Sequence, residues 1–227
     1  MIRAGILMAL TVACRGEIID RIAASVDNHV ITERQVVESI RVAAFLNGMP
    51  PDFSGAQKRL ATDRLVEQYL LRREMDFTRF NRPAETEVEP LLRQVTARFA
   101  GDAAYQAALR VAGITDAEVR QSLRWQLATL RFIDFRFRPS VQITPSDLRD
   151  YYRQQVETWK SKGVKSIPTF GAARADLEKT LAGERADQAL DRWLGEARTQ
   201  TRIVYHDEVF RDPVAPVSSR RAGGAGK

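Results

Sequence analysis

The stretch "EIIDRIAASVDNHVITERQV", from Glu17 to Val36, changes from a strand pattern to a helix pattern at Thr32. Apolar residues alternate on both sides of the pair Asp27-Asn28, and Asn tolerates the positive φ that a tight turn requires, so this part predicts a short β-hairpin. Thr32 and Gln35 then have the spacing of a capping box, in which two side chains satisfy open backbone groups at a helix start. The sequence therefore predicts a hairpin that leads directly into a helix.

Helical patterns continue along most of the chain. Further capping pairs stand at Ser54 and Gln57, at Thr115 and Glu118, and, with Pro at the first helical position, at Thr144 and Asp147. Behind these caps, and again over 88–99 and 173–197, apolar residues recur at helical spacing. The stretch "TRIVYHDEVF" at 201–210 has a strand pattern, and because an isolated hairpin is marginal in water, we expect Ile203 to Asp207 to pair with it. The predicted fold is mainly α, with a small antiparallel β element formed by the N-terminal hairpin and the C-terminal strand.

The N-terminus "MIRAGILMALTVACRGE" has the layout of a secretory signal. One Arg precedes an apolar run from Ala4 to Ala13 that is too short to span a bilayer. Leu10 to Cys14 also resembles a lipoprotein cleavage box, although Thr11 stands where Leu is usual. Cys14 is thus either a lipidation site or the residue after an ordinary cleavage site. In a third interpretation the run is the first buried strand of a cytosolic protein, which the Arg flank and the small residues disfavour.

Residues for catalysis are scarce in this sequence. The two histidines are His29 and His206, and we expect them to be solvent-facing strand residues, because no cysteine or acidic cluster completes a metal-ligand set. No glycine-rich phosphate loop is present. We therefore predict no catalytic residue, cofactor or metal site.

The stretch "LRFIDFRFRPS" at 130–140 interleaves arginines with phenylalanines, a mixture suited to single-stranded nucleic acid. The net charge of +6 also permits binding to nucleic acid, anionic lipid or acidic polypeptide. However, the helical spacing of Phe132 and Phe135 is typical of core packing, and an exported protein seldom meets nucleic acid. A third interpretation is an apolar surface for partly unfolded polypeptide, kept soluble by the arginines. Nucleic acid is not a predicted partner.

The opening stretch resembles that of the SurA-type periplasmic chaperones, which has the form D-R-I-x-A-x-V-x-x-x-V-I-T-x-x-x-V. The matching positions are Asp20, Arg21, Ile22, Ala24, Val26, Val30, Ile31, Thr32 and Val36. The resemblance continues through "RLVEQYLLRREM" (64–75), "GITDAEVRQSLRWQLATLRFIDF" (113–135), "ITPSDLRDYY" (143–152) and "LAGERADQALDRWLGEARTQTRIVY" (181–205). The order of these elements carries more weight than any one of them.

This sequence departs from the SurA type after "ITPSDLRDYY". There the SurA-type chaperones carry a parvulin-type prolyl isomerase domain. In this sequence the corresponding stretch, 156–170, has only fifteen residues, which is too few for a folded domain. The predicted organisation is a signal peptide at 1–14, a SurA-like helical domain at 15–155, a linker at 156–170, a closing helix and strand at 171–210, and a disordered tail at 211–227.

The resemblance implies an ATP-independent periplasmic holdase without isomerase activity. Its partners would be unfolded polypeptides, chiefly outer-membrane or other exported proteins, bound in an apolar groove, with a membrane tether if Cys14 is lipidated. The alternatives are an envelope adaptor or structural subunit, and an isomerase-related protein with residual activity. Large apolar residues near helix ends or loops are the candidates for client binding, with core packing as the alternative for each. They are Phe45, Met49, Phe53, Trp125, Phe132, Phe135, Tyr151, Tyr152 and Trp159.

Overall fold

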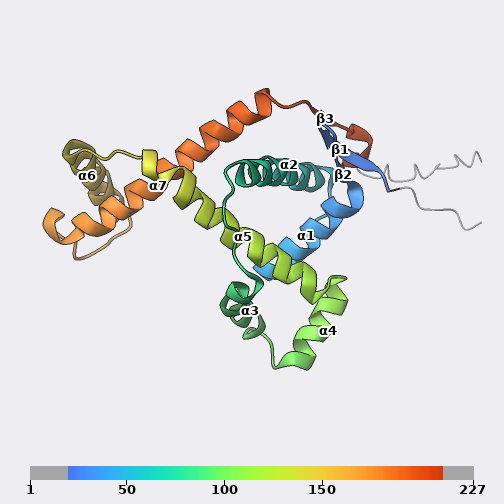
Figure 1. Ribbon diagram of the computed structural model, residues 1–227. Helices are drawn as coiled ribbons and strands as arrows, with labels where there is room; N and C mark the ends of the chain where they lie inside the picture. Colours follow the sequence, from blue (N-terminus) through green and yellow to red (C-terminus); the bar gives the residue numbers. More distant parts are fainter. Residues whose placement is uncertain (1–19, 212–227) are drawn as a thin grey trace, which may run out of the picture.

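The computed structural model describes residues 20–211 (Figure 1). Its elements in chain order are β1 (Ile22–Val26), β2 (His29–Thr32), α1 (Glu33–Asn47), α2 (Gly55–Phe77), η1 (Glu85–Val88), α3 (Glu89–Thr96), α4 (Asp102–Ala112), α5 (Asp116–Arg136), η2 (Arg138–Ser140), α6 (Pro145–Ser161), α7 (Phe170–Thr199), β3 (Ile203–Tyr205) and η3 (Asp207–Phe210). The predicted mainly α fold with a small antiparallel sheet is confirmed. The signal segment, the candidate lipidation site at Cys14 and the tail from 212 onward lie outside the described residues.

The sheet joins the two ends of the described chain. Its strand order is β2-β1-β3 with both pairs antiparallel, so the predicted pairing of the last strand with the hairpin is confirmed. The strand is shorter than predicted, because it ends at Tyr205 and Asp207 begins η3. The turn residue with positive φ is Asp27, at 51°, and not Asn28 as the sequence suggested. Asp27 N–H donates to the Arg202 carbonyl at 2.8 Å, and Arg202 N–H donates to Asp27 Oδ1 at 3.1 Å. The hairpin turn is therefore fixed by the segment that enters β3.

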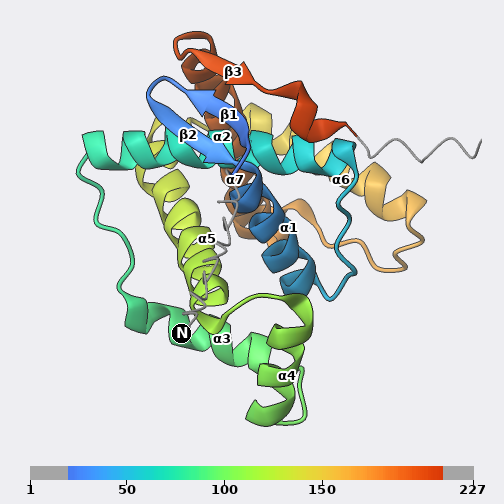
Figure 2. The same ribbon diagram turned by 90° about the vertical axis from the view of Figure 1, so that its right-hand side faces the viewer.

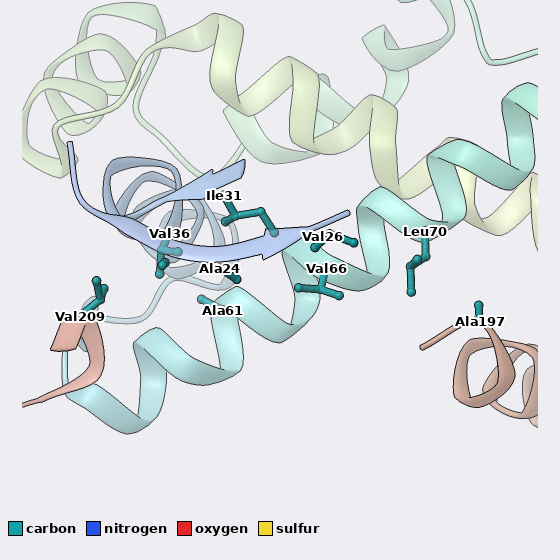
Figure 3. Close-up of a cluster of buried hydrophobic side chains, with 10 residues drawn as sticks. Ala24, Val26, Ile31, Val36, Ala61, Val66, Leu70, Ala197 and Val209 are labelled. Carbon is teal, nitrogen blue, oxygen red and sulfur yellow. The ribbon is translucent and has the colours of Figure 1, made fainter. Parts of the chain in front are cut away.

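One face of the sheet packs on α2 (Figure 3). Val26 of β1, Val36 of α1 and Val66 of α2 are all fully buried in this cluster, and Ala197 of α7 and Val209 of η3 complete it. Its members come from both ends of the described chain. The first core thus holds the sheet, α1, α2 and the end of α7 together.

Three more clusters hold the remaining helices. One surrounds Tyr105 and joins α1, α3, α4 and α5, and another surrounds Phe132 and joins α2, α5 and α7. The last joins α6 to the first half of α7 around Tyr151 and Leu177. This pair of helices extends away from the sheet as an arm (Figure 1), and the 30-residue α7 runs from the arm back to the strands.

The helix starts follow the capping pattern of the sequence. Thr32, Thr115 and Thr144 each form a complete capping box, in which the side chain accepts from the backbone three residues on and that residue's side chain accepts in return. At Ser54 only the first of the two bonds is present, from Gln57 N–H. Local hydrogen bonding therefore fixes where α1, α2, α5 and α6 begin.

The junction between α6 and α7 is shorter than predicted. Residues 156–161, expected in the linker, continue α6, so the connection is reduced to 162–169. Gly163 reverses the chain there with φ of 70°, a conformation that glycine adopts without strain. The Tyr152 hydroxyl donates to the Pro168 carbonyl at 2.9 Å and holds the connection against α6.

Candidate functional site

A groove of about 360 Å³ opens between α1, α2 and α5, with β2 contributing to its wall. The three helices form a triangular frame (Figure 1), and a view turned by 90° shows α1 and α5 side by side below α2 (Figure 2). The volume lies in the range that binding sites for small ligands occupy. Each helix turns one stripe of side chains toward this space, and the stripes differ in chemistry.

The apolar part of the groove carries two large aromatic groups. Tyr69 of α2 stacks on His29 of β2 with ring centroids 4.4 Å apart and an interplanar angle of 6°. Trp125 of α5 is half-buried in the opposite wall, and Leu46 and Leu65 line the groove from α1 and α2. These side chains offer an apolar surface that a ligand can cover.

A guanidinium, that of Arg72 on α2, also faces the groove. Its central carbon lies 5.1 Å from the centre of the Trp125 ring, the geometry of a cation–π contact. Within residues 20–211 its N–H groups make no hydrogen bond or ion pair, whereas Asp76 already pairs with Arg82 at 2.6 Å. Burial and the nearby Arg82 charge lower the pKa of Arg72. A half-buried cation therefore lacks a bonded anion here.

Two carboxyl groups line another part of the groove. Burial, and then the neighbouring Glu118 carboxylate, raise the pKa of Glu38 on α1. Glu118 also completes the capping box of α5, where it accepts from Thr115 N–H at 2.5 Å. The groove thus combines a cation contributed by α2 with an acidic pair contributed by α1 and α5.

Side-chain amides and hydroxyls also line the groove. Gln68 of α2 and Gln121, Ser122 and Gln126 of α5 face the groove, and in the part of the chain that the structure describes their side chains form no hydrogen bond. Gln35 differs, because its side chain closes the capping box of α1. An amide side chain offers one acceptor and two donors, the same kinds of group that a peptide backbone presents.

Among the predicted client-binding residues, only Trp125 lines this groove. Phe132 is fully buried and packs edge-on against Phe80 at 5.2 Å, and Tyr151 is 8% exposed with its hydroxyl donating to Glu184 at 2.5 Å. These two are core residues, and burial raises the pKa of Tyr151 to about 12. Their helical spacing gave no sign of which side of the helix would be covered.

The other candidates are spread over separate surfaces. Met49 and Phe53 are exposed in the loop after α1, and Phe135 is exposed near the end of α5. Phe45 stacks on Phe99 in the cluster around Tyr105, and Tyr152 packs against Trp159 in the arm. The structure does not bring these residues together into one site.

In the interleaved stretch 130–140, phenylalanines contribute to the core and arginines form ion pairs at the surface. The arginines are neutralised by acids. The pairs are Arg131 with Glu87 at 2.6 Å, Arg136 with Glu74 at 3.2 Å and Arg138 with Asp134 at 2.6 Å. Phe132 and Phe137 are buried. This arrangement favours the core-packing interpretation over a strip of cations and stacking surfaces for nucleic acid.

Most residues of the groove, including Tyr69, Arg72 and the glutamines, were not predicted from the sequence. The only sequence signal for these residues was a polar face on the helices that became α2 and α5, which is typical of any solvated helix. No protein-family model matches this chain, and no curated protein matches it. Within residues 20–211 no three His, Cys, Asp or Glu side chains form a group that could hold a metal ion, and no helix is long and apolar enough to cross a membrane.

Proposed function

We propose that this chain is an ATP-independent holdase of the periplasm, which binds short segments of unfolded exported polypeptides in the groove between α1, α2 and α5. The observation that carries the proposal is the lining of this groove. It joins aromatic and aliphatic walls to unbonded side-chain amides, which suits a ligand with apolar side chains and an exposed peptide backbone. The periplasmic location and the outer-membrane clients rest on the signal-like N-terminus and on the resemblance to SurA-type chaperones.

The size of the groove agrees with reversible binding. A space of about 360 Å³ accommodates only a few side chains, so a client covers a limited area at one time. Association also costs translational freedom and side-chain ordering, which leaves a modest net affinity. A weakly held segment dissociates without ATP, while its strand edges are kept from pairing with other chains as long as it is bound.

The proposal includes the absence of prolyl isomerase activity. The connection of residues 162–169 between α6 and α7 has no room for an inserted domain at the place where SurA-type relatives carry theirs. A refolding reaction limited by proline isomerisation tests this part, because the uncatalysed step takes tens of seconds or more. We expect the protein to leave the rate unchanged, and a concentration-dependent acceleration would contradict the proposal.

The holdase proposal is tested with an unfolded β-barrel protein diluted from denaturant, with aggregation followed by light scattering. We expect the wild-type mature protein to suppress aggregation, and Trp125→Ala to need about tenfold more protein for the same effect, because loss of an aromatic contact that costs about 1.4 kcal/mol of binding free energy weakens the affinity tenfold. The matched control is Trp159→Ala, which removes a half-buried tryptophan of the arm, outside the groove. Thermal melting of both variants identifies any loss that comes from unfolding.

Two results would contradict the holdase proposal. The first is no suppression by the wild-type protein at several-fold excess. The second is equal suppression by the folded Trp125→Ala and Trp159→Ala variants, which would separate the activity from the groove. In cells, crosslinking that captures one stoichiometric partner instead of a range of exported proteins would favour an envelope adaptor.

A further inference from the structure

We propose that the groove selects polypeptide segments that carry a carboxylate beside an aromatic or aliphatic residue, and that Arg72 is the anchor for this carboxylate. The inference rests on the proposed polypeptide binding and adds the class of segment that is bound. It is carried by the environment of one cation, which is half-buried, in cation–π contact with Trp125 and without a bonded anion in the described chain.

The charge of Arg72 is left uncompensated by its surroundings. Partial burial removes water from a guanidinium, which is unfavourable unless an anion or hydrogen-bond acceptor replaces that water. The neighbouring Arg82 adds repulsion, and Asp76, whose charge does favour the Arg72 cation, is bonded to Arg82. A ligand carboxylate would supply the missing acceptor, so its binding gains more here than at an exposed arginine.

The guanidinium of Arg72 matches the shape of an anion with two oxygens, such as a carboxylate, better than that of a monatomic anion. Its central carbon lies over the Trp125 ring at 5.1 Å from the ring centre, and within residues 20–211 its N–H groups form no hydrogen bond, which leaves them for a ligand. A guanidinium edge presents two parallel N–H groups that match the two oxygens of a carboxylate, and charge-assisted bonds of this kind are about twice as strong as neutral ones. The tryptophan is also positioned to contact the residue beside the carboxylate.

The acidic pair sets the direction of the bound segment. Glu38 and Glu118 line the same groove, yet within residues 20–211 neither forms an ion pair with Arg72. A carboxylate placed near them would be repelled, whereas backbone N–H groups or a basic side chain would be attracted. The segment therefore lies with its carboxylate at Arg72 and its donors toward Glu38 and Glu118, with the amides of Gln68 and Gln121 available to the backbone between them.

The test uses four synthetic peptides on the wild-type protein. All have the sequence Gly-Ser-Gly-Tyr-X-Val with a fluorescent label on the N-terminal amine, where X is Asp or Asn and the C-terminal Val carries a free acid or an amide. Fluorescence anisotropy gives the Kd of each. We expect the peptides with a carboxylate to bind about tenfold more tightly than the Asn peptide with an amidated end, the size expected for one charge-assisted contact.

The four peptides distinguish two sources of the carboxylate, an internal acidic residue and a chain terminus. Tight binding of the amidated Asp peptide assigns the site to internal acidic residues, and tight binding of the Asn peptide with a free end assigns it to chain termini; either result supports the proposal. Equal binding of all four peptides would overturn it and leave the proposed polypeptide binding intact. Absence of binding by all four, together with no suppression of aggregation, would overturn both.

A pair of variants tests the role of Arg72. We expect Arg72→Gln to abolish the tenfold preference while the amidated Asn peptide still binds, because the apolar contacts remain. The matched control is Arg64→Gln, which removes the same charge from an exposed position of α2 outside the groove and should keep the preference. A preserved preference in folded Arg72→Gln would overturn the assignment, and the wild-type comparison of the four peptides stands whether or not this variant folds.

Discussion

Phe132 and Phe135 lie one turn apart on α5, and the structure gives them opposite roles. Phe132 is fully buried, whereas Phe135 is 53% exposed. Phe132 meets Phe80 edge-on at a centroid distance of 5.2 Å and Phe137 edge-on at 6.1 Å. A third ring contact, tilted, joins Phe132 to Phe135 itself at 6.3 Å. Replacing Phe132 with Ala therefore removes a whole side chain and three aromatic contacts from the cluster that joins α2, α5 and α7.

The expected cost follows from these contacts. A buried Phe→Ala change lowers the free energy of unfolding by about 3–5 kcal/mol, and each of the aromatic pairs accounts for about 0.5–1.5 kcal/mol of such a loss. For a chain of this size, Phe132→Ala should lower Tm by about 10 °C. Phe135→Ala makes the same change of helix propensity at an exposed position, so we expect it to cost less than about 1 kcal/mol.

The assay is urea unfolding followed by circular dichroism, with aggregation suppression measured at a temperature where both variants are folded. We expect Phe132→Ala to lose stability and to keep client binding, because the side chain does not line the groove. The urea midpoints give the difference in the free energy of unfolding between the two variants. A difference of less than about 1 kcal/mol would refute the assignment of Phe132 to the core. Lost binding by a folded Phe132→Ala would instead return this residue to the client surface.

Thr115→Ala removes the cap of α5 and should lower the free energy of unfolding by about 1 kcal/mol, whereas Thr115→Ser should restore most of it; equal urea midpoints for all three proteins would contradict the cap. Asp27→Ala places an alanine at φ of 51° and removes the bond from Arg202 N–H, so we expect a loss of about 1–3 kcal/mol that Asp27→Asn largely avoids. Glu38→Gln should be more stable than the wild type at pH 7, because the pKa of Glu38 is raised in the folded state and its ionisation opposes folding as the pH rises above 4.5. This difference should vanish below pH 4, and a pH-independent difference in Tm would contradict it.

The helix caps and the last strand are the features that local sequence signals predicted correctly. The capping pairs at Thr32, Thr115 and Thr144 were recognised from spacing alone, because a cap is satisfied by atoms within four residues of each other. The strand at Ile203 was recognised from its residue types, and its pairing followed because an isolated hairpin needs a further strand. Local hydrogen bonds and the demand for strand partners thus determined the fold class.

The site needed information that no local pattern contains. Helical spacing places apolar residues on one stripe, but it does not say which neighbour covers the stripe, and so Phe132 and Phe135 looked alike in the sequence. Arg72 and Trp125 are 53 positions apart, and only the crossing of α2 and α5 places the guanidinium over the indole. By itself the sequence predicted most of the helices, the capped starts of α1, α2, α5 and α6, and the closing strand, whereas α4 (Asp102–Ala112) was not predicted. The tertiary structure decided which side chains face the groove and, within residues 20–211, left Arg72 in contact with Trp125 but without a bonded anion, because both depend on how the helices pack against one another.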